Sequence, residues 1–315
     1  MSTEFKKIAF HTMGCKLNFS ETSMISKDFT KRGFKKVKYK EFADIYVLNT
    51  CSVTDNADKE ARKLIRQAKR KNPNAQIAVI GCYAQLMPDQ IAKIDGVNLV
   101  IGTENKFNVL TELDLLNLNS ETKIIRNKIE DVKTFTPSYS SNDRTRTYLK
   151  VQDGCDYTCS FCTIPLARGR SRSDTISNTI KIANQAIRSG AREIVLTGVN
   201  IGDYGKNNKE SFIELIKRLD TLAVERIRIS SIEPNLLTKE IIDFCAESKK
   251  FMPHFHIPLQ SGSNKILKLM RRRYTSSQYA ESISLIRQLI PDASIGVDVI
   301  VGFPGESNED FMETF

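Results

Sequence analysis

Short apolar segments alternate with stretches of helical spacing in the first third of the chain. Segments of strand length lie at residues 8–14, 44–49, 76–81 and 98–102, and helical stretches lie at residues 20–32, 55–71 and 84–94. Asp55 is the predicted N-cap of the second helix, and Pro73 lies just beyond its end. Because strands and helices that alternate in this way form a parallel sheet covered by helices, we expect a Rossmann-like parallel α/β domain at the N-terminus.

The pattern is interrupted and then resumes in the second half of the chain. The stretch TFTPSYSSNDRTRT is polar and rich in turn-forming residues, which favours a linker. Strands are then predicted at residues 147–152, 193–197, 226–230, 254–259 and 294–301, with helices at residues 175–189, 210–219, 238–247 and 278–289. Successive strand–helix units of this kind predict a barrel or partial barrel. We therefore predict domains at residues 1–120 and 144–315, joined by a linker at residues 121–143.

The last predicted unit ends at Phe315, inside a helix that begins only after the turn GFPGE. A native domain rarely stops there, because the helix has no strand to follow it. We therefore expect an incomplete (βα) barrel, truncated before its last strand.

Composition narrows the class of protein. The 315 residues include 47 lysines and arginines against 37 aspartates and glutamates, which gives a net charge of +10, and they include seven cysteines. No apolar run is long enough to span a membrane, and the polar N-terminus lacks the apolar region of a secretory signal. An odd number of cysteines in such a chain argues against a disulfide scaffold. We expect a cytoplasmic protein whose cysteines are buried residues, nucleophiles or metal ligands.

Three cysteines of the first domain each follow a predicted strand directly: Cys15, Cys51 and Cys82. Because the carboxyl ends of parallel strands share one edge of a sheet, we expect the three thiols to converge. Gly14 and Gly81 allow close approach of the backbone. Three neighbouring side chains are candidate hydrogen-bond donors to sulfur: Asn18, Asn49 and Thr50. Zinc and iron–sulfur sites both remain open, and three ligands leave one coordination position free, as in reactive sites.

A second group of three cysteines lies within eight residues, at Cys155, Cys159 and Cys162. The group follows the first predicted barrel strand and so belongs to the carboxyl-terminal mouth, where barrel active sites lie. Thiolates at this spacing suit an iron–sulfur cluster, and three of them leave one iron open to an amine and a carboxylate. The alternative is a structural zinc loop. The CxxxCxxC spacing with Phe161 before the last cysteine resembles the motif of radical S-adenosylmethionine enzymes.

The resemblance extends over nearly the whole chain. Residues 152–173, QDGCDYTCSFCTIPLARGRSRS, resemble the core motif of the methylthiotransferases within that superfamily. Further segments resemble motifs of the same family: TMGCKLNFSET, NTCSVT, GCYAQ, LTGVNIGDYG, ISSIEP, HIPLQSGS and DVIVGFPGE. The Gly-Cys-Lys-Leu-Asn sequence at residues 14–18 resembles the branch that acts on threonylcarbamoyladenosine in tRNA. The family also ends in a small RNA-binding β-barrel, the TRAM domain, which this sequence lacks, so we expect the chain to be weak or inactive.

The resemblance implies two [4Fe–4S] clusters and S-adenosylmethionine as cofactors. Cys155, Cys159 and Cys162 would hold the cluster that generates a 5′-deoxyadenosyl radical. Cys15, Cys51 and Cys82 would hold a second cluster that carries the sulfur to be transferred. The implied reaction places a methylthio group on C2 of N6-threonylcarbamoyladenosine at position 37, in the anticodon loop of tRNA. The sequence identifies neither the sulfur donor nor the electron donor.

Other residues are weaker candidates for cofactor binding. By its place after a strand, Gly198 would approach the methionine moiety of S-adenosylmethionine, although a plain strand-to-loop turn is the alternative. Phe161 would pack near the adenine or anchor its loop. Gln260, with Ser261, would bind cofactor or substrate or cap a helix. Three further residues are expected to be structural: His254, His256 and Cys245.

Basic residues are concentrated in several places. The predicted helix at residues 55–71 carries seven lysines and arginines, all between residues 59 and 71. Arg168, Arg170 and Arg172 follow the second cysteine group, and residues 271–273 are all arginine. Lysine and arginine side chains that neutralise phosphates drive affinity for nucleic acid. We therefore expect an RNA partner, with Arg168 to Arg172 as the best candidates for contacts.

Three alternatives remain. Within the family, the substrate would instead be isopentenyladenosine at position 37 of tRNA, or a ribosomal protein. From a different class, the chain would be a non-catalytic, zinc-dependent RNA-binding protein. Metal content separates this last alternative from the enzyme, because two cubanes contain about eight irons.

Overall fold

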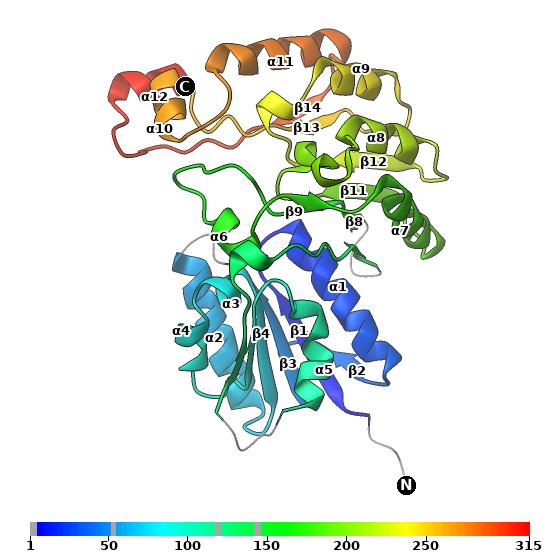
Figure 1. The fold of residues 1–315 in the computed structure, drawn as a ribbon, viewed down its shortest axis with the longest axis vertical. Coiled ribbons are helices and arrows are strands. Elements are labelled where there is room, and N and C mark those ends of the chain that lie inside the picture. Colours follow the sequence, from blue (N-terminus) through cyan, green and yellow to red (C-terminus); the bar gives the residue numbers. More distant parts are fainter. Residues whose placement is uncertain (1–4, 52–54, 117–120, 142–145) are drawn as a thin grey trace. The chain divides into compact units, whose positions relative to one another are not determined.

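The computed structural model describes residues 5–51, 55–116, 121–141 and 146–315 (Figure 1). The chain divides into two compact units. Unit 1 comprises Met1–Thr134, Ser138–Asp143 and Thr163–Arg170, and unit 2 comprises Phe135–Pro137, Arg144–Cys162 and Ser171–Phe315. The polypeptide therefore leaves unit 2 after Cys162, contributes a short segment to unit 1 and returns to unit 2 at Ser171.

Unit 1 contains a parallel sheet of six strands in the order β2-β1-β3-β4-β5-β6. The strands are β1 (Lys7–Thr12), β2 (Lys35–Val37), β3 (Ile45–Thr50), β4 (Gln76–Gly81), β5 (Leu99–Ile101) and β6 (Lys123–Ile125). The chain runs from β1 to β2 on one side and then crosses to β3 on the other. The strand order therefore reverses beside β1, and ligands bind at such switch points in open α/β sheets.

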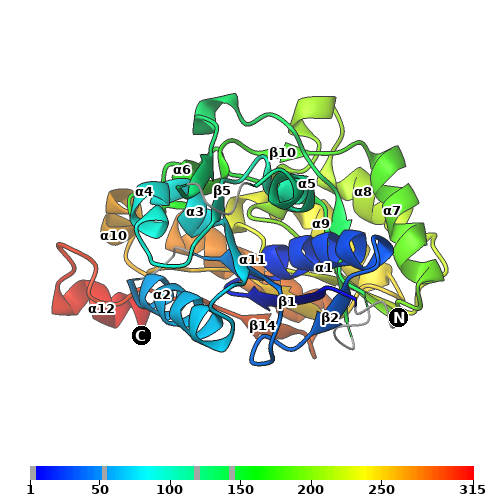
Figure 2. The ribbon, with the colours of Figure 1, turned by 90° about the horizontal axis from the view of Figure 1, so that it is seen from below.

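Helices cover both faces of this sheet, with α1 and α5 on one face and α2 on the other (Figure 2). The helical elements of unit 1 are α1 (Lys16–Lys31), α2 (Asp55–Lys71), α3 (Cys82–Leu86), α4 (Pro88–Ala92), η1 (Lys106–Asn108), α5 (Val109–Asp114), η2 (Ile129–Asp131) and α6 (Ile164–Arg168), and the short strand β7 spans Ser138–Tyr139. The side chain of Asp55, the predicted N-cap, lies outside the described residues.

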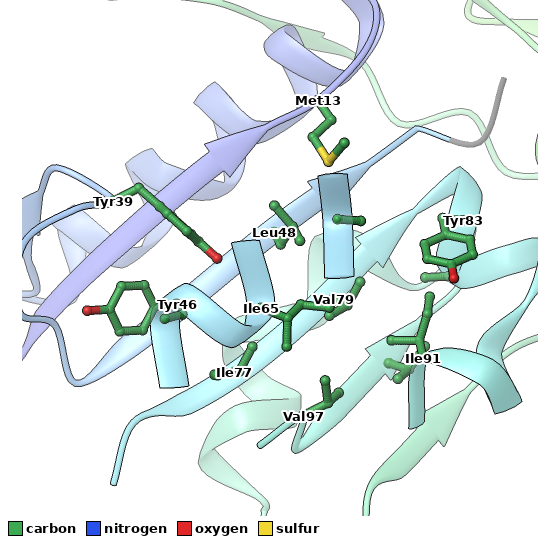
Figure 3. Packing of buried hydrophobic residues seen from close by; sticks show 14 of the residues in the cluster. Met13, Tyr39, Tyr46, Leu48, Ile65, Ile77, Val79, Tyr83, Ile91 and Val97 are labelled. Atoms are coloured by element: carbon green, nitrogen blue, oxygen red, sulfur yellow. The ribbon is translucent and has the colours of Figure 1, made fainter. Parts of the chain in front are cut away.

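Alternation along β3 produces two hydrophobic cores. Tyr46 and Leu48 point to the face covered by α2, where they pack with Ile65 (Figure 3). Ile45 and Val47 point to the other face, where they pack with Phe29 of α1. Because successive strand residues face opposite sides, a strand that is buried on both faces is apolar throughout.

The single helix predicted over residues 84–94 is wrong in one respect, because the structure contains two short helices, α3 and α4. Met87 separates them with a φ of −131° and a ψ of 51°. Pro88 disfavours the helical conformation at the residue before it, and it is itself well suited to the first turn of the next helix.

Unit 2 is built around parallel strands, as expected for a partial barrel. Strands β8 (Thr147–Lys150), β11 (Glu193–Thr197) and β12 (Arg226–Ile229) pair in the order β12-β11-β8. Strands β13 (His254–His256) and β14 (Ser294–Gly296) pair with each other, and a parallel bridge between Ser231 and His256 extends the series beyond β12. The α/β fold class predicted for both halves is confirmed.

The helices of unit 2 lie between these strands in sequence. They are α7 (Ile176–Arg188), α8 (Phe212–Asp220), α9 (Lys239–Glu247), α10 (Asn264–Leu269), α11 (Ser276–Leu289) and α12 (Asn308–Thr314), with 3₁₀ turns η3 (Ile201–Asp203), η4 (Lys206–Asn208) and η5 (Pro234–Leu236). Hydroxyl side chains of Thr175, Ser211, Thr238 and Thr275 accept backbone hydrogen bonds at the first turns of α7, α8, α9 and α11. Such caps fix where each helix begins.

An antiparallel pair follows β8 directly. It consists of β9 (Gln152–Asp153) and β10 (Arg172–Ser173), and the second cysteine group lies between these strands in sequence. Among the described residues, no helix combines the length and the apolar character that crossing a membrane requires.

Candidate functional site

The structure places the three dispersed cysteines at the ends of adjacent strands of unit 1. Cys15 follows β1 and precedes α1, Cys51 follows β3, and Cys82 is the first residue of α3 after β4. Burial raises the pKa of Cys82, and the nearby thiol of Cys15 raises it further. The three residues therefore lie at one edge of the sheet, beside the switch point.

Two glycines make this edge tight. Gly14 has a φ of +86°, and a Cβ there would lie 2.6 Å from Cβ and 2.8 Å from Sγ of Cys51. Gly81 has a φ of +98°, and a Cβ there would lie 2.5 Å from Oδ1 of Asn49. Both positions combine a left-handed backbone with a neighbour that leaves no room, so only glycine fits without rearrangement.

Asn18 joins the ends of two strands. Its Nδ2 donates to the carbonyl oxygens of Met13, at 2.8 Å, and of Thr50, at 3.1 Å. The Nδ2 of Asn49 donates to Asn18 O and to the Thr22 hydroxyl, and the Thr50 hydroxyl donates to Ile80 O. The expectation that these three side chains donate to sulfur is therefore wrong, because their donors are used by oxygen atoms that align the strand ends.

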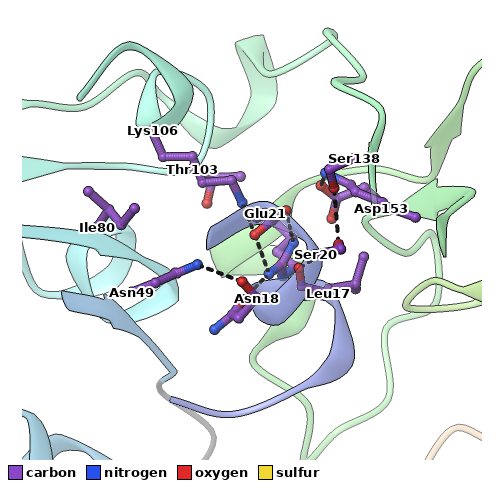
Figure 4. Close-up of polar contacts among 12 residues, drawn as sticks. Leu17, Asn18, Ser20, Glu21, Asn49, Ile80, Thr103, Lys106, Ser138 and Asp153 are labelled. Carbon is purple, nitrogen blue, oxygen red and sulfur yellow. Dashed lines mark hydrogen bonds and ion pairs between the residues drawn. The ribbon is translucent and has the colours of Figure 1, made fainter. Parts of the chain in front are cut away.

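Three charged side chains are buried together beside this edge: Glu21, Lys106 and Arg168 (the buried triad). Their side chains are at most 1% exposed. Lys106 Nζ lies 2.6 Å from Glu21 Oε2, and Arg168 Nη1 donates to Glu21 Oε1 at 3.2 Å. Arg168 Nη2 donates to Asn18 Oδ1 at 2.5 Å. Figure 4 shows Glu21, Asn18 and Lys106 converging from α1 and η1.

The buried triad has no local signal in the sequence, and it corrects the expected role of Arg168. A guanidinium that is buried and bonded to Glu21 and Asn18 is not available to phosphates. Arg172 is also buried, and its Nη2 lies 3.3 Å from Asp153 Oδ2. Of the three arginines expected to contact RNA, only Arg170 is exposed.

The second cysteine group forms a compact loop of unit 2 at the carboxyl end of β8. Cys159 is buried, whereas Cys155 and Cys162 are half-buried. Cys162 N donates to Cys159 O at 3.1 Å, and Tyr157 N donates to Cys155 Sγ at 3.4 Å. Burial raises the pKa of Cys155 to about 11. The loop therefore presents three thiols from one short turn, each with some protein cover.

A segment that is distant in sequence holds this loop in place. Ser160 donates through its backbone to Met270 O at 3.2 Å and through its hydroxyl to Leu269 O at 3.0 Å. Arg272 Nη1 donates to Cys159 Sγ at 3.2 Å, and its Nη2 is ion-paired with Glu233. Arg272, one arginine of the predicted basic run, therefore contacts the loop that carries the second cysteine group.

Gln152 is the central hydrogen-bonding residue beneath the loop, and no pattern in the sequence points to it. The side chain is fully buried, and its Nε2 donates to Gly154 O at 2.7 Å, Asp153 O at 3.1 Å and Ser171 Oγ at 2.9 Å. Its Oε1 accepts from Val199 N at 2.9 Å and Asn200 N at 2.8 Å. Gln152 therefore joins the residue before Cys155 to the loop after β11.

The three predicted cofactor-binding residues lie in different local settings. A Cβ at Gly198 would lie 2.6 Å from Ile201 Cγ2 and 2.9 Å from Gln152 Oε1, so close packing requires this glycine. Phe161 is exposed. Gln260 has a φ of +65° and continues the strand pairing, through its N–H to Asp298 O. Their roles toward a cofactor stay predictions.

Two residues expected to be structural are placed as such. His256 is partnered on both ring nitrogens, by the Ser231 hydroxyl and by Asp298 Oδ2 at 3.2 Å. Cys245 is buried on α9, and burial raises its pKa to about 12.

Within the described part of the chain, no three histidine, cysteine, aspartate or glutamate side chains are gathered closely enough to hold a single metal ion. A cubane makes a different demand, because each of its thiolates binds a separate iron. Three cysteines at neighbouring strand ends, and three on one turn, offer the number and type of donor atom that such a cluster requires.

Comparisons with known proteins show which proteins this chain resembles. Residues 7–102 match the family described as Uncharacterized protein family UPF0004, and residues 149–315 match the Radical SAM superfamily. The threonylcarbamoyladenosine tRNA methylthiotransferases MtaB of Bacillus subtilis and Aquifex aeolicus are 44% and 40% identical, each over 98% of this chain and over 69% and 76% of the relative. A tRNA-2-methylthio-N(6)-dimethylallyladenosine synthase of Endomicrobium trichonymphae is 34% identical over 96% of this chain and 71% of its own length.

Two solved structures share the fold at low sequence identity. The radical S-adenosylmethionine methyltransferase TsrM from Kitasatospora setae has a TM-score of 0.66 and 13% identity, over 98% of this chain and 71% of that one. The cobalamin-dependent radical enzyme OxsB has a TM-score of 0.63 and 15% identity, over 99% of this chain and 51% of that one. The relatives and the two matched families establish that the chain belongs to the radical S-adenosylmethionine methylthiotransferases.

Proposed function

We propose that this chain transfers a methylthio group to C2 of N6-threonylcarbamoyladenosine at position 37 of tRNA. The observation that carries the choice of substrate is the difference in identity between relatives. Relatives named for threonylcarbamoyladenosine are 38–44% identical to this chain, whereas those named for dimethylallyladenosine are 34% identical.

The two groups of thiols fit the cofactors of such an enzyme. Cys155, Cys159 and Cys162 are the proposed ligands of the [4Fe–4S] cluster that the superfamily implies. The cysteines at the sheet edge of unit 1 are the proposed ligands of a second: Cys15, Cys51 and Cys82. When bound, the first cluster supplies the electron that converts S-adenosylmethionine into a 5′-deoxyadenosyl radical, and the second supplies the sulfur.

The residues around the thiols have separate tasks in this proposal. Arg272 donates to the Cys159 sulfur, which orients this proposed ligand. Ser160 and Gln152 fix the backbone on either side of Cys155. Half-burial of Cys155 and Cys162 limits access of water to the proposed cluster. The chain thus orients and shields, while the cofactors carry the radical chemistry.

One face of α2 supports an RNA partner. Lys59, Lys63, Arg66 and Arg70 recur at spacings of three and four residues, and all four are exposed. The opposite face carries Ala61, Ile65 and Ala68, which are buried in the core. Residues spaced in this way share one side of a helix, so their cations form a stripe that can neutralise successive phosphates.

The proposal is tested by mass spectrometry of nucleosides from tRNA of cells that lack the gene. We expect loss of 2-methylthio-N6-threonylcarbamoyladenosine and its return when the intact gene is restored. Loss of the isopentenyl analogue alone would contradict the proposed substrate. Loss of a methylthio group from a ribosomal protein, with tRNA unchanged, would overturn the RNA assignment. A colourless, zinc-loaded protein after anaerobic purification would contradict the iron–sulfur chemistry.

Gly14→Ala should remove the iron of the second cluster. The new Cβ would overlap Cys51, so its thiol must move away from the sheet edge. We expect anaerobically reconstituted protein to lose about four of its roughly eight irons, measured by iron analysis and visible absorption.

Gly33→Ala is the matched control. Gly33 has the same φ of +86°, but a Cβ added there would meet no atom within 4 Å beyond its chain neighbours. It therefore carries the same backbone strain, roughly 1–2 kcal/mol, without the overlap. Full iron content in Gly33→Ala with half in Gly14→Ala supports the assignment, and equal iron content in the two variants would contradict it.

A further inference from the structure

A cavity of about 460 Å³ lies beside α1 in unit 1. In this unit α1 contacts both β2 and β7, and Figure 1 shows α1 beside β2. The described residues that line the cavity carry hydroxyl or ammonium groups: Ser23, Ser26, Thr30, Ser141, Lys27, Lys31 and Lys36. These described lining residues include no carboxylate, so the cavity combines positive charge with hydrogen-bond donors.

The spacing of residues along α1 produces this polar wall. Ser23, Lys27 and Lys31 recur at intervals of four residues, so they share one side of the helix. Ile25 and Phe29 are instead buried in the hydrophobic core that α1 forms with the sheet. The helix therefore turns an apolar side to the sheet and a polar, cationic side to the cavity.

Lys27 is the residue of this wall that lacks an acceptor. Its Nζ is shielded from solvent, and no atom of the described residues accepts a hydrogen bond from it. It lies 3.6 Å from the centre of the Tyr139 ring, which attracts the charge but supplies no oxygen acceptor. A shielded ammonium without an acceptor is unfavourable, because it has lost its hydration. Since the lysine stem is flexible, a change of rotamer brings Nζ to an anion in the cavity.

Hydroxyl groups of α1 add further donors. Ser23 Oγ accepts from Ser141 N at 3.1 Å, which leaves its own O–H group as a donor. Thr30 Oγ1, by contrast, donates to Ser26 O at 3.0 Å within the helix. The donors offered to a ligand therefore include the hydroxyls of Ser23 and Ser26 beside the ammonium groups. A tetrahedral oxyanion accepts several charge-assisted hydrogen bonds at once, so it suits this set of donors.

One carboxylate on the same helix competes only weakly with such an anion. Asp28 Oδ1 lies 3.9 Å from Lys31 Nζ, and the two side chains are 49% and 77% exposed. Exposed ion pairs of this kind contribute little to stability, because water and salt screen them. Lys31 can therefore exchange this contact for one with an anion in the cavity.

We propose that this cavity binds a phosphate group, held by Lys27, Lys31 and the hydroxyl of Ser26. The choice of source rests on the proposed function, under which the phosphate belongs to the sugar–phosphate backbone of tRNA. Helical residues rise about 1.5 Å each, so Lys27 lies roughly 18 Å along α1 from Cys15. The phosphate site is therefore separate from the proposed second cluster.

The test measures the binding of two probes to the purified full chain. Inorganic phosphate is titrated by calorimetry, with sodium chloride of equal ionic strength as the reference. An unmodified tRNA transcript is followed by fluorescence anisotropy at several salt concentrations. Lys27→Met removes the ammonium and keeps the length of the side chain. We expect phosphate binding to weaken roughly tenfold or more, and the slope of log affinity for tRNA against log salt to fall by about one.

Two further variants separate loss of the site from loss of charge. Ser26→Ala keeps every charge and should weaken phosphate binding by roughly three- to tenfold. Lys181→Met is the matched control, because Lys181 is exposed on α7 of unit 2 and does not line the cavity. It should leave phosphate binding and the salt slope unchanged. Iron content should match the parental chain in every variant. Should Lys27→Met fail to fold, Ser26→Ala still decides through phosphate binding.

The two probes also distinguish the source of the phosphate. A smaller salt slope for tRNA in Lys27→Met supports the proposal with the tRNA backbone as the source. Weaker phosphate binding with an unchanged slope supports the cavity as a site for free phosphate instead. If neither probe distinguishes Lys27→Met from Lys181→Met, the inference is overturned. The proposed function then stands, because the nucleoside analysis of tRNA tests it independently of this cavity.

Discussion

Cys155→Ala should abolish reductive cleavage of S-adenosylmethionine. The loop that carries Cys155, Cys159 and Cys162 supplies one sulfur ligand to each of three irons of the proposed cubane. Removing one of these cysteines leaves only two protein ligands, which are too few to hold the cluster. We expect loss of about four irons and no detectable 5′-deoxyadenosine, measured by chromatography after incubation with dithionite. The remaining irons should belong to the proposed second cluster.

Cys245→Ala is the control for the loss of a thiol. Cys245 is also a cysteine with restricted access to solvent, but it lies on α9 and not on the loop. Its replacement should lower the free energy of unfolding by about 1 kcal/mol and leave iron content and cleavage intact. If Cys155→Ala keeps its iron and still cleaves the cofactor, the assignment of this loop is wrong.

Gln152→Leu should strongly destabilise unit 2. Leucine has a similar volume, but it cannot form the hydrogen bonds of Gln152. Two backbone N–H groups and the carbonyl of Gly154 would lose this buried partner. Each unsatisfied buried group costs about 1–3 kcal/mol. We expect the free energy of unfolding to fall by roughly 3 kcal/mol or more, measured by urea denaturation followed by circular dichroism.

The loop around Cys155 should also loosen in Gln152→Leu, so the iron of that cluster should be lost more rapidly in the presence of a chelator. Gln185→Leu is the control, because Gln185 is exposed on α7. Surface substitutions of this kind change stability by about 0.5 kcal/mol or less. Equal stability of the two variants would show that Gln152 does not organise the loop.

Much of the fold could be predicted because its strands and helices follow strong local patterns. The prediction agrees with the structure to the residue for α2, β4 and β11. By contrast, β2 and β6 lie at the edges of the sheet, and each has only three residues. An edge strand of that length carries no periodic signal that distinguishes it from a loop.

The candidate site shows the same division between local and distant information. The cysteines could be placed because each follows a strand or lies on one turn. Arg168 and Glu21 could not be paired, because 147 residues separate them and only the folded chain brings them together. Without that contact, the run Arg168 to Arg172 looks like a basic surface. Gln152 could not be identified for a related reason, since its acceptor role toward Val199 depends on the pairing of β8 with β11.

The passage of the chain from unit 2 into unit 1 and back has a consequence for biosynthesis. A ribosome completes most of unit 1 before it begins unit 2, yet residues 163–170 belong to unit 1 and follow the thiol loop of unit 2. The buried arrangement of Glu21 and Lys106 is therefore complete only after Arg168 has been synthesised. The nascent chain cannot complete unit 1 until Cys155, Cys159 and Cys162 have been synthesised. Both groups of cysteines are therefore already part of the chain when unit 1 finishes folding.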